Sequence, residues 1–170
     1  IGQSNSGGSD TSWLLRIYSS GKLGSECWDG GWNYNSLADS SALTLNTWHH
    51  IALVRKRTSI SLYKNGSLVD SSTISSSFKS SDSGHNLGIG ALGDGYSPYM
   101  SNCYLDEIRI VKGRAVYTGN FTPPTALTTT GGTYSSETNV EHPTGTQTKL
   151  LIHSGRQEAK GPKVVGRLSP

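Results

Sequence analysis

Short apolar segments with a period of two, each ended by a turn signal, constrain this chain more than any other feature. In residues 13–18, for example, Trp13, Leu15 and Ile17 alternate with residues of the opposite face, as in a strand with one side on a core. Comparable segments follow at 22–28, 32–37, 48–56, 60–64, 67–74, 87–91 and 103–111. Many short strands without a helical stretch predict an all-β chain folded as an antiparallel jelly-roll β-sandwich.

The dipeptide Asn65-Gly66 separates two of these segments, 60–64 and 67–74. Both residue types tolerate a positive φ, which a type I′ turn requires at its two central positions. The sequence therefore predicts a β-hairpin with this dipeptide at its tip.

Segment 48–56 is apolar on both faces. One face takes Trp48, His50, Ala52 and Val54, and the other takes His49, Ile51 and Leu53. Such a run is typical of a strand buried between layers, so we assign Trp48 to the core. We also assign Trp13, on the apolar face of segment 13–18, to the core. His49 and His50 point to opposite faces and cannot share one metal ion; we expect one in the core and one on the outer face of its sheet.

Composition and charge exclude several classes of protein. Hydrophobic residues make up 33% of the chain and charged residues 16%, with 21 glycines, which argues against a helical bundle. The net charge is +3, and residues 1–127 carry ten Lys or Arg against nine Asp or Glu, so no basic surface for nucleic acid is expected. No apolar run approaches the roughly 18 residues of a membrane span, and no signal peptide is seen, so we expect no membrane insertion.

The character of the chain changes after residues 121–124. We predict a domain at 1–127, a polar linker at 128–147 and a basic, strand-bearing tail at 148–170. The spacing of Cys27 and Cys103 fits no metal motif, and two separate buried thiols are favoured over a disulfide.

Three motifs carry a resemblance to a known family. They are 47–55 (TWHHIALVR), 62–66 (LYKNG) and 104–110 (YLDEIRI), and they closely resemble laminin G-like jelly-roll modules of the concanavalin A-like lectin/glucanase superfamily. The segments 112–118 (KGRAVYT) and 120–124 (NFTPP) look like the version found in phage tail and other virion proteins. The resemblance implies a virion-surface or extracellular location.

The resemblance has one departure. Modules of this family usually open with a strand that reads roughly LLLHFD, and that portion is missing before Ile1. Residues 149–154 (KLLIHS) look like such a strand, placed after the domain. Either the chain is cut from a tandem array, or this late strand completes its own domain or that of a neighbour; we favour completion, because missing strands would leave sheet edges unpaired.

We expect no enzyme. Glycosidases need two carboxylates on one face, whereas Glu26 and Asp29 are three residues apart and Asp106 and Glu107 are adjacent. No serine lies in a Gly-x-Ser-x-Gly motif either.

The resemblance implies one structural calcium ion. Related lectin folds use an aspartate at the start of the last strand, the position of Asp106, and Asp94 is a loop carboxylate that could help to bind the metal. The alternative is that Asp106 caps a backbone turn and Asp94 is solvated.

Two groups of aromatic and polar residues are the candidates for carbohydrate binding. The first is Trp28, Asp29, Trp32, Asn33, Tyr34 and Asn35, and the second is Asp94, Tyr96, Tyr99 and Asn102. Sugars need aromatic faces beside amide or carboxylate groups, although the first group could equally be cross-strand packing. The resemblance therefore implies attachment to cell-surface glycans; the alternative is an assembly module that contacts other virion subunits, or copies of itself, through residues 148–170.

Overall fold

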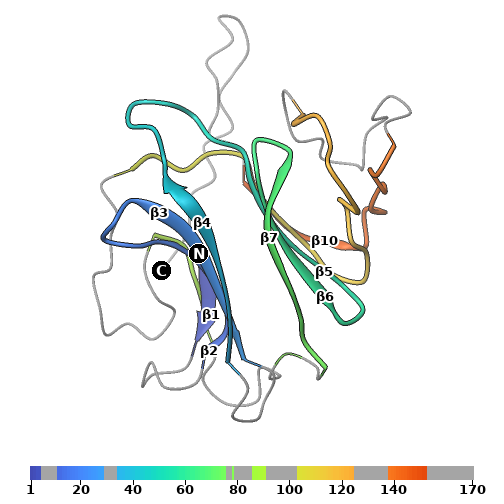
Figure 1. Ribbon diagram of the computed structural model, residues 1–170. Coiled ribbons are helices and arrows are strands. Elements are labelled where there is room, and N and C mark those ends of the chain that lie inside the picture. Colours follow the sequence, from blue (N-terminus) through green and yellow to red (C-terminus); the bar gives the residue numbers. More distant parts are fainter. Residues whose placement is uncertain are drawn as a thin grey trace, which may run out of the picture.

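The computed structural model describes residues 1–4, 11–28, 34–75, 78, 86–90, 103–124 and 138–152. Every regular element in these ranges is a strand, and every strand pair is antiparallel. The strands are β1 Gly2–Ser4, β2 Thr11–Ile17, β3 Lys22–Trp28, β4 Tyr34–Ala42, β5 Ile51–Lys56, β6 Ser59–Lys64, β7 Ser67–Thr73, β8 Asn86–Gly88, β9 Ile108–Val111 and β10 Thr148–Ile152. They form an antiparallel β-sandwich (Figure 1), which confirms the predicted all-β jelly-roll class.

The larger sheet has the strand order β4-β3-β2-β1-β8. Its inner face carries Leu23, Cys27 and Leu37, which are at most 2% exposed and pack in the main core cluster. Trp13 and Leu15 of β2 lie against the same cluster. The period of two in the sequence thus places one apolar face of this sheet on the core, as predicted.

The smaller sheet has the order β5-β6-β7. Its β6–β7 hairpin turns at Asn65 and Gly66, whose φ angles of 52° and 81° are the positive values that a type I′ turn needs. The predicted hairpin is confirmed.

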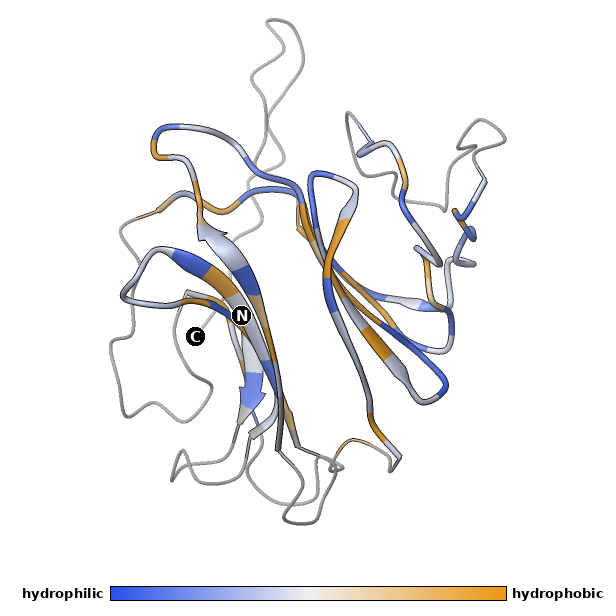
Figure 2. Cartoon of the chain, in the orientation of Figure 1, coloured by the Kyte–Doolittle hydropathy of each residue, from blue (hydrophilic) through white to orange (hydrophobic). Residues whose placement is uncertain are grey.

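The smaller sheet is covered on both faces. Toward the larger sheet, Ile60 and Leu62 are 0% exposed in the main core cluster. On the other face, Val54 and Tyr63 form a second cluster with Val116 and other residues of the segment that follows β9. Figure 1 shows that segment on the side of β5 and β6 away from the larger sheet, and Figure 2 shows apolar residues along the strands and polar ones at the turns. The double coverage explains why residues 51–54 are apolar on both faces.

The late strand pairs within the chain. β10 lies antiparallel to β9, with Leu150 opposite Ile110 and Ile152 opposite Ile108. The boundaries predicted near residues 127 and 147 stay a prediction.

Three sequence expectations are wrong. Trp48 is 69% exposed rather than in the core, because β5 begins only at Ile51 and the strand alternation does not extend back to residue 48. Segment 103–111 is a strand only from Ile108 onward, and Tyr104 is 89% exposed. Cys103 is exposed and not buried.

The two cysteines are free, as expected. Cys27 is buried, and this burial raises the pKa of its thiol to about 12. The Cys27 thiol is therefore protonated and unreactive at neutral pH.

Replacing Gly66 with Ala should strongly destabilise the protein. A Cβ at this position would lie 1.8 Å from the backbone oxygen of Phe121, and the φ of +81° is itself unfavourable for Ala. We expect a loss of about 2–4 kcal/mol in unfolding free energy, a fall of roughly 5–15 °C in melting temperature.

Gly90→Ala is the matched control for this measurement. Gly90 has a similar φ of +77°, but no atom of the described residues lies within 4 Å of the place that a Cβ would take. It should cost only the about 1–2 kcal/mol of the left-handed backbone. Equal losses in the two variants would show that the contact with Phe121 contributes nothing.

Candidate functional site

The first candidate group lies at the end of the β3–β4 hairpin where residues 29–33 join the two strands. The Cα atoms of Trp28 and Tyr34 are paired across the two strands, and Cys27 is paired with Asn35 one step further in. The connection 29–33, which contains Asp29, Trp32 and Asn33, lies outside the described residues. The register therefore brings Trp28 and Tyr34 together, Asn35 follows on β4, and the other members of the group belong to the five residues that join the two strands.

The second candidate group is not described. Asp94, Tyr96, Tyr99 and Asn102 all lie within 91–102, outside the described ranges. Their part in carbohydrate binding stays a prediction.

A cluster of charged and aromatic side chains lies on β2 and β3 and was missed by the sequence reasoning. Arg16 forms an ion pair with Glu26 at 3.1 Å, and its guanidinium carbon lies 4.3 Å from the centre of the Tyr18 ring. The Tyr18 hydroxyl donates to Glu26 at 3.5 Å, and the ring lies over Gly24, where a Cβ would be 2.1 Å away. Burial and the Glu26 charge raise the pKa of Tyr18. The sequence pattern could have indicated this cluster, because alternate residues on both sides of the 18–22 turn share one face of the sheet.

This cluster bears on the search for catalytic acids. Glu26 was one of the carboxylates considered, and it is held by Arg16 and Tyr18. Its possible partner Asp29 lies outside the described residues. Among the described residues, the contacts of Glu26 are those of a carboxylate that links two strands, and its pairing with Asp29 stays untested.

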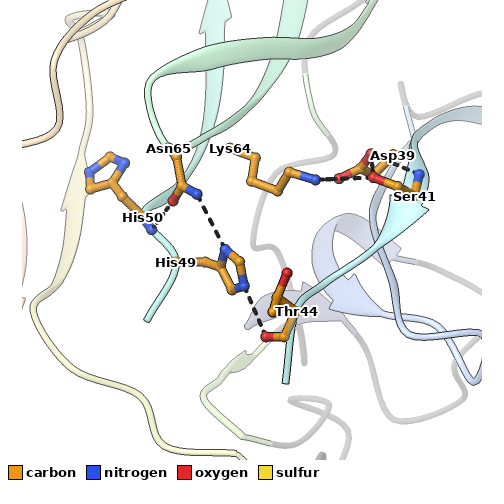
Figure 3. Close-up of polar contacts among 7 residues, drawn as sticks. All are labelled: Asp39, Ser41, Thr44, His49, His50, Lys64 and Asn65. Carbon is orange, nitrogen blue, oxygen red and sulfur yellow. Dashed lines mark hydrogen bonds and ion pairs between the residues drawn. The ribbon is translucent and has the colours of Figure 1, made fainter. Parts of the chain in front are cut away.

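A polar network joins the two sheets beside the β6–β7 turn (Figure 3). Lys64 of β6 donates to the Asp39 carboxylate of β4, and it also reaches the Ser41 hydroxyl at 3.4 Å. Ser41 in turn donates to Asp39 through its backbone N–H at 3.0 Å and its hydroxyl at 3.1 Å. Asp39 is 5% exposed, so these contacts compensate a buried charge.

The pKa of Asp39 reflects two opposing effects. Burial raises the pKa, whereas the hydrogen bond from Lys64, the two from Ser41 and the Lys64 charge lower it. The net result is a pKa below the ordinary value, so this carboxyl is ionised at neutral pH and stabilises the native state.

The two histidines lie on either side of Asn65 (Figure 3). The Asn65 amide oxygen accepts from the His50 N–H at 2.9 Å, and the Asn65 N–H donates to the His50 carbonyl at 2.8 Å. The Asn65 side-chain nitrogen also lies 3.3 Å from Nδ1 of His49, whose Nε2 is 3.1 Å from the Thr44 carbonyl. These contacts fit a His49 ring that donates through Nε2 and accepts at Nδ1.

The ring of His50 packs among aromatic side chains. Its centre lies 5.8 Å from that of Tyr117 and 5.4 Å from that of Phe121, both in edge geometry. Burial, together with the charge of Arg109, lowers the pKa of His50. The His50 ring therefore lies against Tyr117 and Phe121, whereas the His49 ring is held by Asn65 and Thr44. Both histidines are half-buried and precede β5, so the expectation that one of them lies in the core is wrong.

Of the two proposed calcium ligands, the structure describes only Asp106. Asp106 Oδ1 accepts from the Glu107 N–H at 2.7 Å, and Glu107 has a φ of 51°, which is the local contact of a turn-capping aspartate. Among the described residues, no three His, Cys, Asp or Glu side chains gather as a metal site would require. Because Asp94 lies outside those residues, the calcium site stays a prediction.

None of the residues that the structure describes belongs to a helix that could cross a membrane.

Three comparisons relate the chain to known proteins. Residues 1–115 match the family model Laminin_G_3, described as the concanavalin A-like lectin/glucanases superfamily. No curated protein matches the sequence. One solved structure that matches is an S-layer domain-containing protein from Clostridium thermocellum, with 23% identity and a TM-score of 0.31, over 68% of this chain and 59% of that chain. At this TM-score the likeness carries no inference about function.

The Asp39 ion pair predicts a stability loss in acid. Since the pKa of Asp39 is lower in the native than in the unfolded chain, the stabilisation is complete above the unfolded value of 3.8 and is lost as pH falls through the native pKa. We expect Asp39→Asn to cost about 1.5–3 kcal/mol near neutral pH, because Lys64 loses its charged partner. In urea unfolding, the difference in unfolding free energy between Asp39→Asn and wild type should shrink below about pH 4. A difference that stays constant across pH would contradict the assignment.

His50 predicts a second pH effect, in a different range. Its pKa is below 6.5 in the native chain, so the unfolded chain takes up a proton first and stability falls as pH drops below about 6.5. His50→Phe retains the ring contacts and should remove this slope, which is at most about 1.4 kcal/mol per pH unit. The slope is measured as the pH dependence of the free energy of unfolding in denaturant; a slope that is equal in His50→Phe and in wild type would contradict the assignment.

Proposed function

The chain belongs to the concanavalin A-like lectin/glucanase superfamily, and on this basis we propose that it is a non-enzymatic carbohydrate-binding module. In this proposal it is part of a virion structural protein, such as a phage tail fibre, head fibre or decoration protein, and attaches the particle to cell-surface glycans. Its location would then be the virion surface or another extracellular setting. The motifs at 112–118 and 120–124, which resemble those of virion proteins, support the virion assignment.

The observation that carries the glycan proposal is the register of the β3–β4 hairpin. Trp28 and Tyr34 are Cα partners at its end, so the five residues between them join two paired positions. That connection supplies Asp29, Trp32 and Asn33, a carboxylate, an indole and an amide. Aromatic faces beside a few polar groups are the usual means of holding a sugar ring. The site would thus be presented at one end of a rigid sheet, as binding loops commonly are.

A calcium ion is a separate element of this proposal. Asp106 would supply a carboxylate and Asp94 a loop oxygen, and oxygen ligands of this kind suit Ca²⁺. The ion would order the rim loops and not react with a substrate. Chelation therefore tests it directly.

Glycan binding is tested with the intact chain on a panel of bacterial and algal polysaccharides, with calcium and with chelator. Trp32→Ala and Tyr34→Ala should each abolish binding with little change in melting temperature. Trp48→Ala and Tyr104→Ala are matched controls, since these exposed aromatics lie outside the proposed site and should leave binding unchanged.

The remaining outcomes are equally informative. A collapse in melting temperature for Trp32→Ala and Tyr34→Ala would assign the two residues to packing. Loss of binding only in chelator would support the metal at Asp106. A folded chain that binds no polysaccharide in either condition would overturn the glycan proposal.

A second candidate function is assembly, through contacts of the C-terminal part with other virion subunits or with copies of the same chain. The observation that favours it is the way residues 138–152 attach to the sandwich. They run as a backbone-paired segment along residues 108–120, with β10 on β9 and Val140 bridged to Tyr117. A strand held in this way is a common means of joining subunits.

A further inference from the structure

Residues 138–152, called here the C-terminal segment, are held by backbone contacts at residues 139–141 and again at 147–152. The Thr118 N–H donates to the Asn139 carbonyl at 2.9 Å, and the Glu141 N–H donates to the Val116 carbonyl at 2.7 Å. The Lys112 N–H donates to the Gln147 carbonyl at 2.8 Å, and from residue 148 onward the β9–β10 ladder takes over. The segment therefore binds much as an added strand does.

Side chains fix the position of this segment. Glu141 forms ion pairs with Arg114 at 3.2 Å and with Lys56 at 3.5 Å. Asn139 donates to the Asn120 carbonyl at 3.1 Å and lies so close to Gly119 that a Cβ there would be 2.8 Å away. The ion pairs are exposed and worth little individually, but together with the close contact they specify one register.

The surface that receives the segment is compact in sequence. All of the contacts above are made with residues 108–120, apart from the ion pair with Lys56. The C-terminal segment is thus a separate unit that docks onto one continuous surface.

The connection between the two is long. Residues 125–137 join the receiving part to the segment, and thirteen residues can span at most about 45 Å when extended. Their composition is dominated by Thr, Ser and Gly. A segment on such a connection can reach a neighbouring molecule.

We propose that the C-terminal segment of one copy of this chain binds residues 108–120 of a second copy, through the same contacts that it makes within its own chain. The proposal rests on the assembly candidate above, and it names both the partner and the strand. Exchange of an identical segment loses no contact, so the linked form differs from the single chain mainly in the entropy of the connection. Because the connection keeps the segment at a high effective concentration near its own chain, the exchanged form should grow with protein concentration. Where every chain both donates and receives in one direction, copies would link in series.

Cross-linking between two differently tagged full-length chains tests the exchange. One carries Ile108→Cys and the other Ile152→Cys, at positions that are Cα partners in β9 and β10, and both carry Cys103→Ser to remove the exposed thiol. After mixing under mild oxidation, we expect a disulfide-linked pair of unlike chains whose yield rises with concentration. A chain with Ser40→Cys in place of Ile108→Cys, at an exposed position of the other sheet, measures random collision.

A chain that carries both Ile108→Cys and Ile152→Cys shows whether the variants fold and pair. It should close an internal disulfide and give several-fold less linkage to other chains. A second pair, Val111→Cys with Thr148→Cys, repeats the test at the other end of the ladder if the first pair fails to close.

Charge reversal shows that the linkage uses the observed contacts. Glu141→Lys in the donating chain faces Lys56 and Arg114 in either chain, so it weakens docking within the chain and between chains alike and should by itself change the linked yield little. Combined with Arg114→Glu in the receiving chain, it should raise the linked yield, because the two reversed charges attract only across the two molecules; an unchanged yield would contradict the use of these contacts.

Linkage no greater than the Ser40→Cys control, with an internal disulfide that closes, would overturn the proposal. If sedimentation of the wild-type chain still shows oligomers in that case, the assembly candidate stands and uses another surface. If the chain is also a monomer at every concentration, the exchange and the assembly candidate both fail, and the glycan proposal is unaffected.

Discussion

The two residues of the turn at Asn65-Gly66 make the contacts on which the rest of the structure depends. Its asparagine binds the backbone of His50 on one side, and its glycine carbonyl accepts from the Phe121 N–H at 2.9 Å on the other. Two residues thus fix the entry to β5 and the segment that follows β9, which are far apart in the sequence. Only glycine permits this approach, because any Cβ at position 66 would overlap the Phe121 backbone.

The position of Phe121 then determines the second core cluster. Its ring stacks on that of Tyr117 with centres 3.6 Å apart and meets Tyr63 edge-on at 5.6 Å. This packing covers the outer face of β5 and β6, while the main core cluster covers the inner face. Across the inner interface, the Asp39–Lys64 pair joins β4 to β6, and the bond from the Ala38 N–H to Asp70 at 3.0 Å joins β4 to β7. The sandwich is therefore held by apolar packing between the sheets and by polar contacts at one margin.

Local signals predicted the fold well, and they failed where tertiary contacts decide. The hairpin at Asn65-Gly66 was predictable because its turn chemistry is a property of two adjacent residues. Trp48 was misplaced because the alternation was extended through a turn, where Asn46 has a φ of 55° and the strand has not begun. The Arg16–Tyr18–Glu26 cluster escaped notice because it requires the β2–β3 register. For the glycan group, the sequence supplies the residue types and the register of Trp28 and Tyr34 supports their proximity, but pairwise strand patterns do not specify how the connection between them is arranged.

The two proposed activities make different demands on the same sandwich. A sugar site at the β3–β4 end needs a rigid sheet beneath it, and the larger sheet provides this through its packing on Ile60 and Leu62. Exchange of the C-terminal segment needs a contact that can be released without opening that core. The segment meets this requirement because, among its described residues, Val140 alone packs against the second cluster. The core between the sheets and the docking surface lie on opposite faces of β5 and β6. A change of partner at β9 would therefore leave the main core, and with it the support of the β3–β4 hairpin, undisturbed.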